Sequence, residues 1–308
     1  MTGRVTLQFH PDWPFADGLV IEALAGDGVY RSQFETGTSN GGLTAHPGGD
    51  RWRWESRLFQ GRYDEGPATD RPVYGALNHR ERPHGGSVRF GSAYLRLRPE
   101  VAARSTFCFP DSVFEPELVG GPDRLSELVA LADVAGHDAL DDYVEAHVHG
   151  GVRLDRDVEA AVLDPCFRGG PVEAAARDVG CPVEWHPGFE VATAGLDESY
   201  RGPEFVALAR SLGEVLTPAV IGAAARTGEH DPQALKRVWH LLARFGRLAG
   251  QRNGDGGDLQ SPGDCRSLLS GLLRQGADGG QEGEPVDHDG EDEQPDRPTG
   301  MTRGPERE

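Results

Sequence analysis

A polar, glycine-rich stretch at residues 28–50 places the tightest constraint on how this chain can fold. It starts like a short strand, because Val29, Tyr30 and Phe34 supply apolar side chains. Glycine, threonine, serine and asparagine follow, and these residue types favour loops over packed elements. We therefore expect a short strand that ends in an exposed loop, where function is often carried.

Arg31 lies on this predicted strand, and Gly37 and Asn40 lie in the loop that follows. A guanidinium is always charged and can bind a phosphate through paired hydrogen bonds. Glycine also lets backbone N–H groups approach a ligand closely. The stretch is therefore predicted to bind a phosphate or diphosphate. The alternative is a surface loop in which Arg31 pairs with Glu35 or Asp50.

Changes in the apolar pattern indicate how the chain is divided. Residues 1–195 alternate β-rich segments with short helices, which predicts an α+β core with a mixed, split or bent sheet and flanking helices. Residues 196–250 carry apolar side chains at helical spacing and are predicted to form a helical segment. Residues 251–308 are rich in glycine and acidic residues, so we expect a disordered acidic tail.

The predicted elements follow from local periodicity. Strands are expected at residues 4–9, 72–78, 90–98, 104–109, 142–152 and 183–186. Helices are expected at residues 18–25, 51–61, 123–134, 155–163, 172–179, 203–212, 218–226 and 232–248. In the helix at 51–61, Trp54, Leu58 and Phe59 should share one face. Along the strand at 142–152, alternation should bring Glu145 and His147 to the same face.

Composition narrows the function classes. The net charge of -19 argues against general nucleic-acid binding, which needs a basic surface. All but one of the 31 basic residues are arginine, the exception being Lys236, as the codon usage of a GC-rich genome favours. The four cysteines show no metal-binding or disulfide spacing. With neither a signal peptide nor a membrane-length apolar run, we expect a soluble cytoplasmic protein of undetermined oligomeric state.

Several short motifs of the sequence resemble those of a bacterial family classed as a domain of unknown function. They are YRSQFETGTSNGG, RPVYGALN, FGSAYLRL and the strand that combines Glu145 with His149-Gly150. The resemblance covers residues 5–167 and implies no particular activity.

A more remote resemblance is to the ADP-ribosyltransferases, and it rests on the order of three short patches. Tyr30-Arg31 is similar to the strand pair that opens the NAD site in that superfamily, and Glu145 lies on a late strand, where its catalytic glutamate stands. The resemblance implies that Arg31 binds a phosphate of NAD, the substrate. It also implies that Glu145 stabilises the oxocarbenium-like transition state as nicotinamide leaves.

Hydroxyl and aromatic residues complete this resemblance. Ser92, Ser105 and Thr106 stand where the superfamily carries hydroxyl residues that orient the nicotinamide ribose. Tyr74 is expected either to stack on the nicotinamide or to be an ordinary core tyrosine. Tyr143 occupies the position where protein-arginine transferases carry a second glutamate or glutamine. The acceptor, including a possible protein acceptor, and the choice between transfer and hydrolysis are therefore left open.

Histidines suggest a rival chemistry. His10 and Asp12 form an HxD turn after the first strand, and His147 and His149 form an HxH pair on one strand face. Such spacing suits Zn or Mn, because both imidazoles can point toward one ion. The alternatives are thus a metal-dependent hydrolase that uses these four residues, or a non-catalytic domain that binds a nucleotide or a protein.

Overall fold

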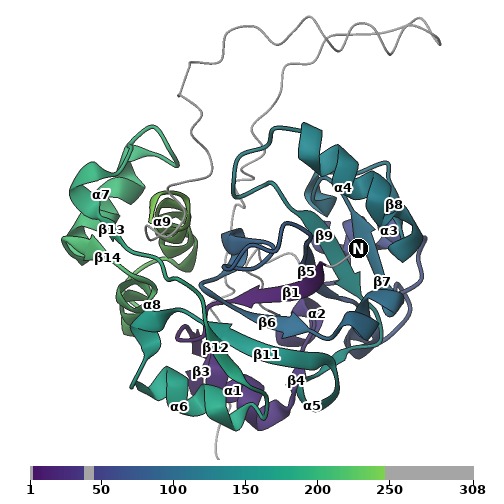
Figure 1. Cartoon of the computed structure of the whole chain (residues 1–308), viewed down its shortest axis with the longest axis horizontal. Coiled ribbons are helices and arrows are strands. Elements are labelled where there is room, and N and C mark those ends of the chain that lie inside the picture. Colours follow the sequence, from purple (N-terminus) through teal and green to yellow (C-terminus); the bar gives the residue numbers. More distant parts are fainter. Residues whose placement is uncertain (1–2, 38–44, 247–308) are drawn as a thin grey trace, which may run out of the picture. The chain divides into compact units, whose positions relative to one another are not determined.

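The computed structural model describes residues 3–37 and 45–246, and its centre is an eight-stranded sheet (Figure 1). The strand order is β12-β11-β6-β1-β5-β9-β7-β8, and the pairs are antiparallel except β11 with β12. The strands are β1 (Arg4–Phe9), β5 (Val73–Asn78), β6 (Ala93–Leu97), β7 (Ser105–Cys108), β8 (Val119–Gly120), β9 (Val144–Val148), β11 (Val158–Leu163) and β12 (Val183–Trp185). The predicted α+β class with a mixed sheet is confirmed.

The first strand is central, and its alternating residues build the main core. Val5, Leu7 and Phe9 are all nearly inaccessible to solvent. Leu7 is opposite Leu95 of β6, and Val5 is opposite Leu77 of β5. Apolar side chains at alternate positions thereby stack on one face of the sheet.

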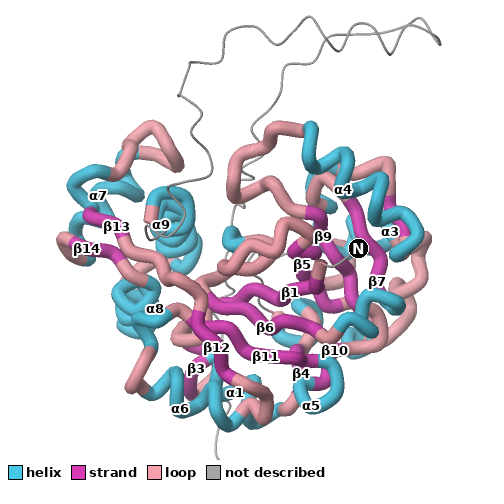
Figure 2. Tube along the Cα trace, in the orientation of Figure 1, coloured by secondary structure: helices cyan, strands magenta, loops and turns pink. Residues whose placement is uncertain are grey.

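Helices flank this sheet (Figure 2). In the view of Figure 2, α1 (Val20–Asp27) and α6 (Pro171–Asp178) pack against each other below the strands. Helix α4 (Leu125–Val134) contacts β7 and β9, while α3 (Asp50–Leu58) contacts the turn that follows β7. The helix predicted at 51–61 is present, but its most buried side chains are Arg51 and Glu55 rather than an apolar stripe.

Three further helices surround a second hydrophobic cluster. They are α7 (Pro203–Leu212), α8 (Pro218–Thr227) and α9 (Pro232–Phe245), and each begins with proline in its first turn, where no backbone donor is needed. Trp239 of α9 is fully buried there, and its Nε1–H donates to the carbonyl of Val88 at 2.9 Å. The helices predicted after residue 195 are confirmed up to Phe245. The predicted tail at 251–308 lies outside the described residues.

One sequence prediction is wrong in type. The helix expected at 155–163 is a short α5 (Leu154–Asp157) followed by strand β11. Strand β11 lies between β6 and β12, and all of its residues except Glu159 are buried, so apolar side chains fall on both faces of the strand. Tertiary pairing therefore overrides local propensity here.

The strand expected before the glycine-rich loop is also shorter than predicted. Strand β4 comprises only Val29–Tyr30, and helix α2 (Gln33–Thr36) follows it. The Ser32 hydroxyl accepts from the Glu35 N–H at 3.3 Å, and the Glu35 carboxylate accepts from the Ser32 N–H at 2.7 Å. This capping box is the S-x-x-E signal of a helix start, so the helix was readable in the sequence.

Short elements complete the structure. Small pairs are formed by β4 with β10 (Val152–Arg153), β2 (Pro14–Phe15) with β3 (Gly18–Leu19), and β13 (Val191–Ala192) with β14 (Val215–Leu216). The 3-10 turns are η1 (Ala68–Asp70), η2 (Val88–Phe90), η3 (Pro99–Arg104), η4 (Ser112–Phe114), η5 (Pro122–Arg124), η6 (Pro165–Phe167) and η7 (Thr193–Gly195). Among the described residues, no helix has the length and apolar character needed to cross a membrane.

Candidate functional site

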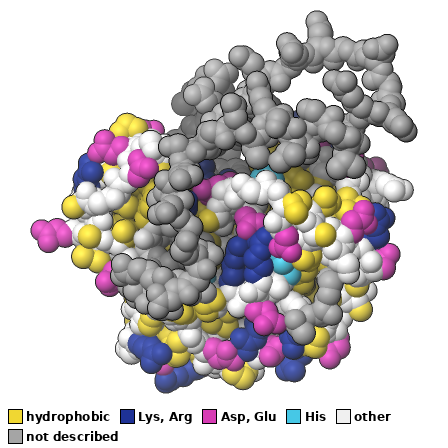
Figure 3. Space-filling model, turned by 45° about the horizontal axis from the view of Figure 1, so that its top comes forward, with side chains coloured by type: hydrophobic (Ala, Val, Ile, Leu, Met, Phe, Trp, Pro, Cys, Tyr) yellow, Lys and Arg dark blue, Asp and Glu magenta, His cyan; other side chains and the backbone are white. Residues whose placement is uncertain are grey.

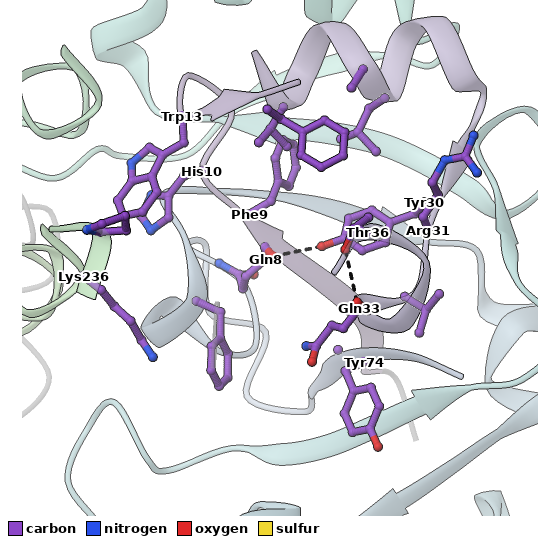
Figure 4. Close-up of a pocket in the computed structure, with 18 of the residues that line it drawn as sticks. Gln8, Phe9, His10, Trp13, Tyr30, Arg31, Gln33, Thr36, Tyr74 and Lys236 are labelled. Atoms are coloured by element: carbon purple, nitrogen blue, oxygen red, sulfur yellow. Dashed lines mark hydrogen bonds between the residues drawn. The ribbon is translucent and has the colours of Figure 1, made fainter. Parts of the chain in front are cut away.

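The candidate site is a pocket of about 430 Å³ against strands β1, β5 and β9, which we call the central pocket (Figure 4). Segment 30–36, α3 and η2 contribute further walls, and the start of α9 closes one side. The residues that line this pocket include Gln8, Arg31, Arg51, Tyr74, Arg89, Glu145 and Lys236. Its volume is in the range of sites that bind small molecules.

Three of the residues predicted to bind or cleave NAD meet in this pocket. Arg31, Tyr74 and Glu145 come from the segment after β4, from β5 and from β9 respectively, and all three line it. Strands β5 and β9 are hydrogen-bonded neighbours, so Tyr74 and Glu145 are held on adjacent strands of a rigid sheet. The tertiary fold thus assembles groups that are more than a hundred residues apart in sequence.

Arg31 stands at the edge of this group, and its charge is shared with two carboxylates. Its Nε donates to Asp27 at 2.8 Å, and a terminal nitrogen lies 3.7 Å from Glu35. The side chain is 43% exposed, and in Figure 4 its guanidinium points away from Gln8. The alternative pairing predicted with Glu35 is therefore present, although Asp27 is the nearer partner.

Glu145 is buried in the sheet and is held by hydrogen bonds. One of its carboxylate oxygens lies 2.7 Å from Nε2 of His147. Burial, and then the neighbouring Asp111 carboxylate, raise the pKa of Glu145 well above its usual value. Arg51 opposes this shift, and its guanidinium also lies 4.6 Å from the centre of the Tyr74 ring. The pocket therefore holds a carboxyl group that retains its proton more strongly than an exposed glutamate does.

A chain of hydrogen bonds continues from Glu145 toward the surface. The Thr106 hydroxyl lies 3.1 Å from Nδ1 of His147 and 3.0 Å from Nε2 of His149. Nδ1 of His149 then lies 2.6 Å from the Tyr63 hydroxyl. Burial lowers the pKa of each histidine to about 4, so both imidazoles are neutral at pH 7 and can each donate one hydrogen bond. Thr106 thus bridges two histidines and does not line the pocket.

The other predicted site residues take structural roles or lie outside the description. The Ser105 hydroxyl donates to the Val101 carbonyl at 2.9 Å, so it satisfies the turn that precedes β7. Ser92 is buried before β6, and neither serine lines the central pocket. Gly37 ends α2 with a φ of 63°, a conformation that favours glycine. Asn40 lies outside the described residues.

The predicted metal ligands do not form one group. The His10 ring stacks on Trp13 at 4.5 Å, and Asp12 pairs with Arg226 at 3.0 Å. The HxH pair instead belongs to the hydrogen-bond chain of Glu145. Within residues 3–37 and 45–246, one trio has ligand atoms close enough to share an ion, all within 4.8 Å of one another: Cys108, Glu145 and His147.

Several charged residues of the site had not been predicted from the sequence. Arg51, Arg89 and Lys236 line the pocket, and Asp111 is a direct neighbour of Glu145. Only Lys236 carried a signal, since it is the single lysine in the chain. On the face shown in Figure 3, acidic and basic side chains are interspersed over the described surface.

No curated protein matches this chain. A family model described as "Protein of unknown function (DUF3626)" matches residues 4–132 and 123–245, which together include nearly every described residue. The sequence resemblance to a domain of unknown function is thereby confirmed, and it extends through the C-terminal helices that line the pocket. The chain belongs to the DUF3626 family.

Proposed function

We propose that this protein cleaves the nicotinamide–ribose bond of NAD and passes ADP-ribose either to an acceptor or to water. The observation that carries the proposal is that Arg31, Tyr74 and Glu145 line one pocket of about 430 Å³. These residues come from three separate parts of the chain, and their types match what the reaction needs. A cation for phosphate, an aromatic ring for nicotinamide and a carboxylate for developing positive charge are then available in one site.

Each residue has a distinct part in this proposal. Arg31 uses donors that Asp27 and Glu35 leave available to bind a phosphate at the outer edge of the pocket. Tyr74 offers an aromatic surface next to the bond that breaks. Glu145, in its ionised form, accepts a hydrogen bond from a ribose hydroxyl and stabilises the oxocarbenium-like transition state. His147 orients the carboxyl group through the 2.7 Å contact.

The raised pKa of Glu145 gives the proposal a pH signature. Because the ionised carboxylate is the active form, turnover should increase as pH rises through a value above the usual range of glutamate. A buried carboxylate of this kind is also a stronger electrostatic stabiliser than one in water. The environment that makes ionisation costly therefore makes the ionised form effective.

The test is NAD titration by calorimetry together with nicotinamide release for wild type, Arg31→Ala and Glu145→Gln. Arg31→Ala should weaken NAD binding by about 1.5–3 kcal/mol, the value of a hydrogen bond to a charged group. Glu145→Gln should bind NAD but lose about a hundredfold or more in kcat. Arg53→Ala, an exposed arginine that pairs with Asp50, is the matched control and should change neither quantity. Absence of NAD binding by wild type would end the proposal.

A second candidate is a metal-dependent hydrolase, which the trio of Cys108, Glu145 and His147 favours. Thiolate, carboxylate and imidazole suit Zn, provided that the Cys108 thiol loses its proton, and burial raises the pKa of that thiol. Elemental analysis after purification decides between the candidates. One Zn per chain that is lost in Cys108→Ser supports a metal site, whereas metal-free protein that releases nicotinamide supports NAD cleavage.

A further inference from the structure

Lys236 extends from α9 into the central pocket, on the side opposite Arg31 in Figure 4. It is the only lysine among 31 basic residues, so an arginine-rich chain retains a different cation at this one position. The side chain is mostly buried, yet it reaches the pocket with its ammonium group. Lysine presents a compact charge that can lose its proton when buried, which arginine cannot do.

Among the described residues, no carboxylate pairs with this ammonium group. Within residues 3–37 and 45–246, no ion pair or hydrogen bond is made by the Lys236 side chain. Arg31 differs, because it is 43% exposed and pairs with Asp27 and Glu35. Burying an unpaired cation is costly, so a site that keeps one is suited to an anion that arrives from outside.

The electrostatic surroundings of Lys236 are dominated by positive charge. Burial, and then a set of arginines, lower its pKa to about 7, so the ammonium group gives up its proton far more readily than that of an exposed lysine. Asp231 also lines the pocket, and Asp141 pairs with Arg89 on η2. The groups that interact electrostatically with Lys236 from the surrounding elements are His10, Arg51, Arg89, Arg201, Arg237 and His240, and His230 also lines the pocket.

We propose that Lys236, together with Arg89, forms an anion subsite at the α9 end of the central pocket that binds a phosphate group. The phosphate belongs either to inorganic phosphate or to a phosphate monoester. Binding favours the protonated form of Lys236, which burial and the cationic surroundings disfavour, because the bound anion stabilises the ammonium group. The subsite therefore gains positive charge when the anion binds.

The position of the subsite indicates what the anion does. Arg51 is a charged neighbour of both Lys236 and Glu145, and Lys236 lies on the side of the pocket opposite Arg31 in Figure 4. If NAD extends from Arg31 to Glu145, the Lys236 end is left for a second substrate. The assignment of the anion to an acceptor with a phosphate group rests on the proposed function, whereas the anion subsite itself does not.

The experiment is calorimetric titration of the full chain with sulfate, which keeps two negative charges throughout the neutral pH range. Two buffers with different ionisation enthalpies report the protons taken up on binding. Near neutral pH wild type should take up a fraction of a proton per sulfate, because binding favours the ammonium form of Lys236. Between about pH 6 and pH 8 its affinity should fall up to about tenfold. Inorganic phosphate and ribose 5-phosphate, titrated in parallel, distinguish the two sources of the phosphate group.

Two variants test Lys236 directly. Lys236→Met should lose the proton uptake and bind sulfate at least about tenfold more weakly, the effect of one lost charged contact. Lys236→Arg should bind sulfate without proton uptake, and it covers the case in which the methionine variant does not fold. Arg210→Met, an exposed arginine on α7 that pairs with Glu198, is the control and should match wild type.

The outcomes separate this inference from the proposed function. Sulfate binding by Lys236→Met with wild-type affinity and uptake would overturn the subsite, as would no binding of any of the three anions by wild type. Proton uptake that depends on Lys236, in a protein that releases no nicotinamide from NAD, supports the subsite and rejects only the NAD reaction. Nicotinamide release without anion binding rejects only the subsite.

Discussion

Replacing Glu145 with glutamine should stabilise the protein while it lowers kcat by about a hundredfold or more. The folded state raises the pKa of this carboxyl group, chiefly through burial and then through Asp111. A carboxyl group with a raised pKa destabilises the folded state at any pH above its unfolded pKa, because the folded protein resists ionisation. Glutamine resembles the protonated form and carries no such penalty.

The magnitude follows from linkage. Each pKa unit of upward shift corresponds to about 1.4 kcal/mol at high pH, and about 1 kcal/mol changes Tm by about 2–4 °C in a domain of this size. We therefore expect Glu145→Gln to raise Tm by at least about 2 °C at about pH 8. The gain should vanish below about pH 4.5, where the carboxyl group is protonated in both the folded and the unfolded state.

The assay is thermal unfolding across pH, combined with nicotinamide release. Glu159→Gln is the matched control, because Glu159 lies on β11, is about one-third exposed and pairs with Arg4 at 3.2 Å. The free energy of unfolding of this control should fall by up to about 1 kcal/mol at neutral pH, because a surface ion pair contributes no more than that. A Glu145→Gln protein that is less stable than wild type at about pH 8 would refute the reasoning about burial. Normal turnover by the same variant would remove Glu145 from the chemistry.

Three further predictions concern the framework of the site. Arg71→Met should lower the free energy of unfolding, measured in urea, by about 3–5 kcal/mol, because it leaves Glu55, its partner at 2.6 Å, buried and unpaired. A loss under about 1 kcal/mol would contradict this. The double variant Arg71→Met/Glu55→Leu should recover much of that loss, and no recovery would argue against a charge effect. His10 has its pKa lowered to about 3, so the folded state disfavours its protonation, and stability is lost as pH falls below about 6.5. The free energy of unfolding of His10→Phe relative to wild type should therefore rise by about 2 kcal/mol as pH falls from about 7 to about 5. A difference that does not change with pH would contradict the lowered pKa of His10.

The sequence alone predicted the elements whose signals are local. Proline in the first turn and periodic apolar residues located α7, α8 and α9, and alternation located β1, β5 and β9. The phrases around Arg31 and Tyr74 predicted membership of a family of unknown function, and the same residues line the central pocket. The residue types at these positions identified them as candidate site residues without any knowledge of the fold.

Only the tertiary structure decided which of these candidates share a site. Ser105 and Thr106 are as polar as any binding residue, but their hydroxyl groups bond to a turn carbonyl and to two histidines. Conversely, Arg51 reads as an ordinary helix residue, and the fold buries it beside Glu145. Hydrogen bonding, burial and charge depend on neighbours that are distant in sequence, and local patterns carry no information about such neighbours. Lys236 has an ordinary lysine pKa in an open chain and one of about 7 in the fold, because burial and surrounding arginines act only after the chain has packed.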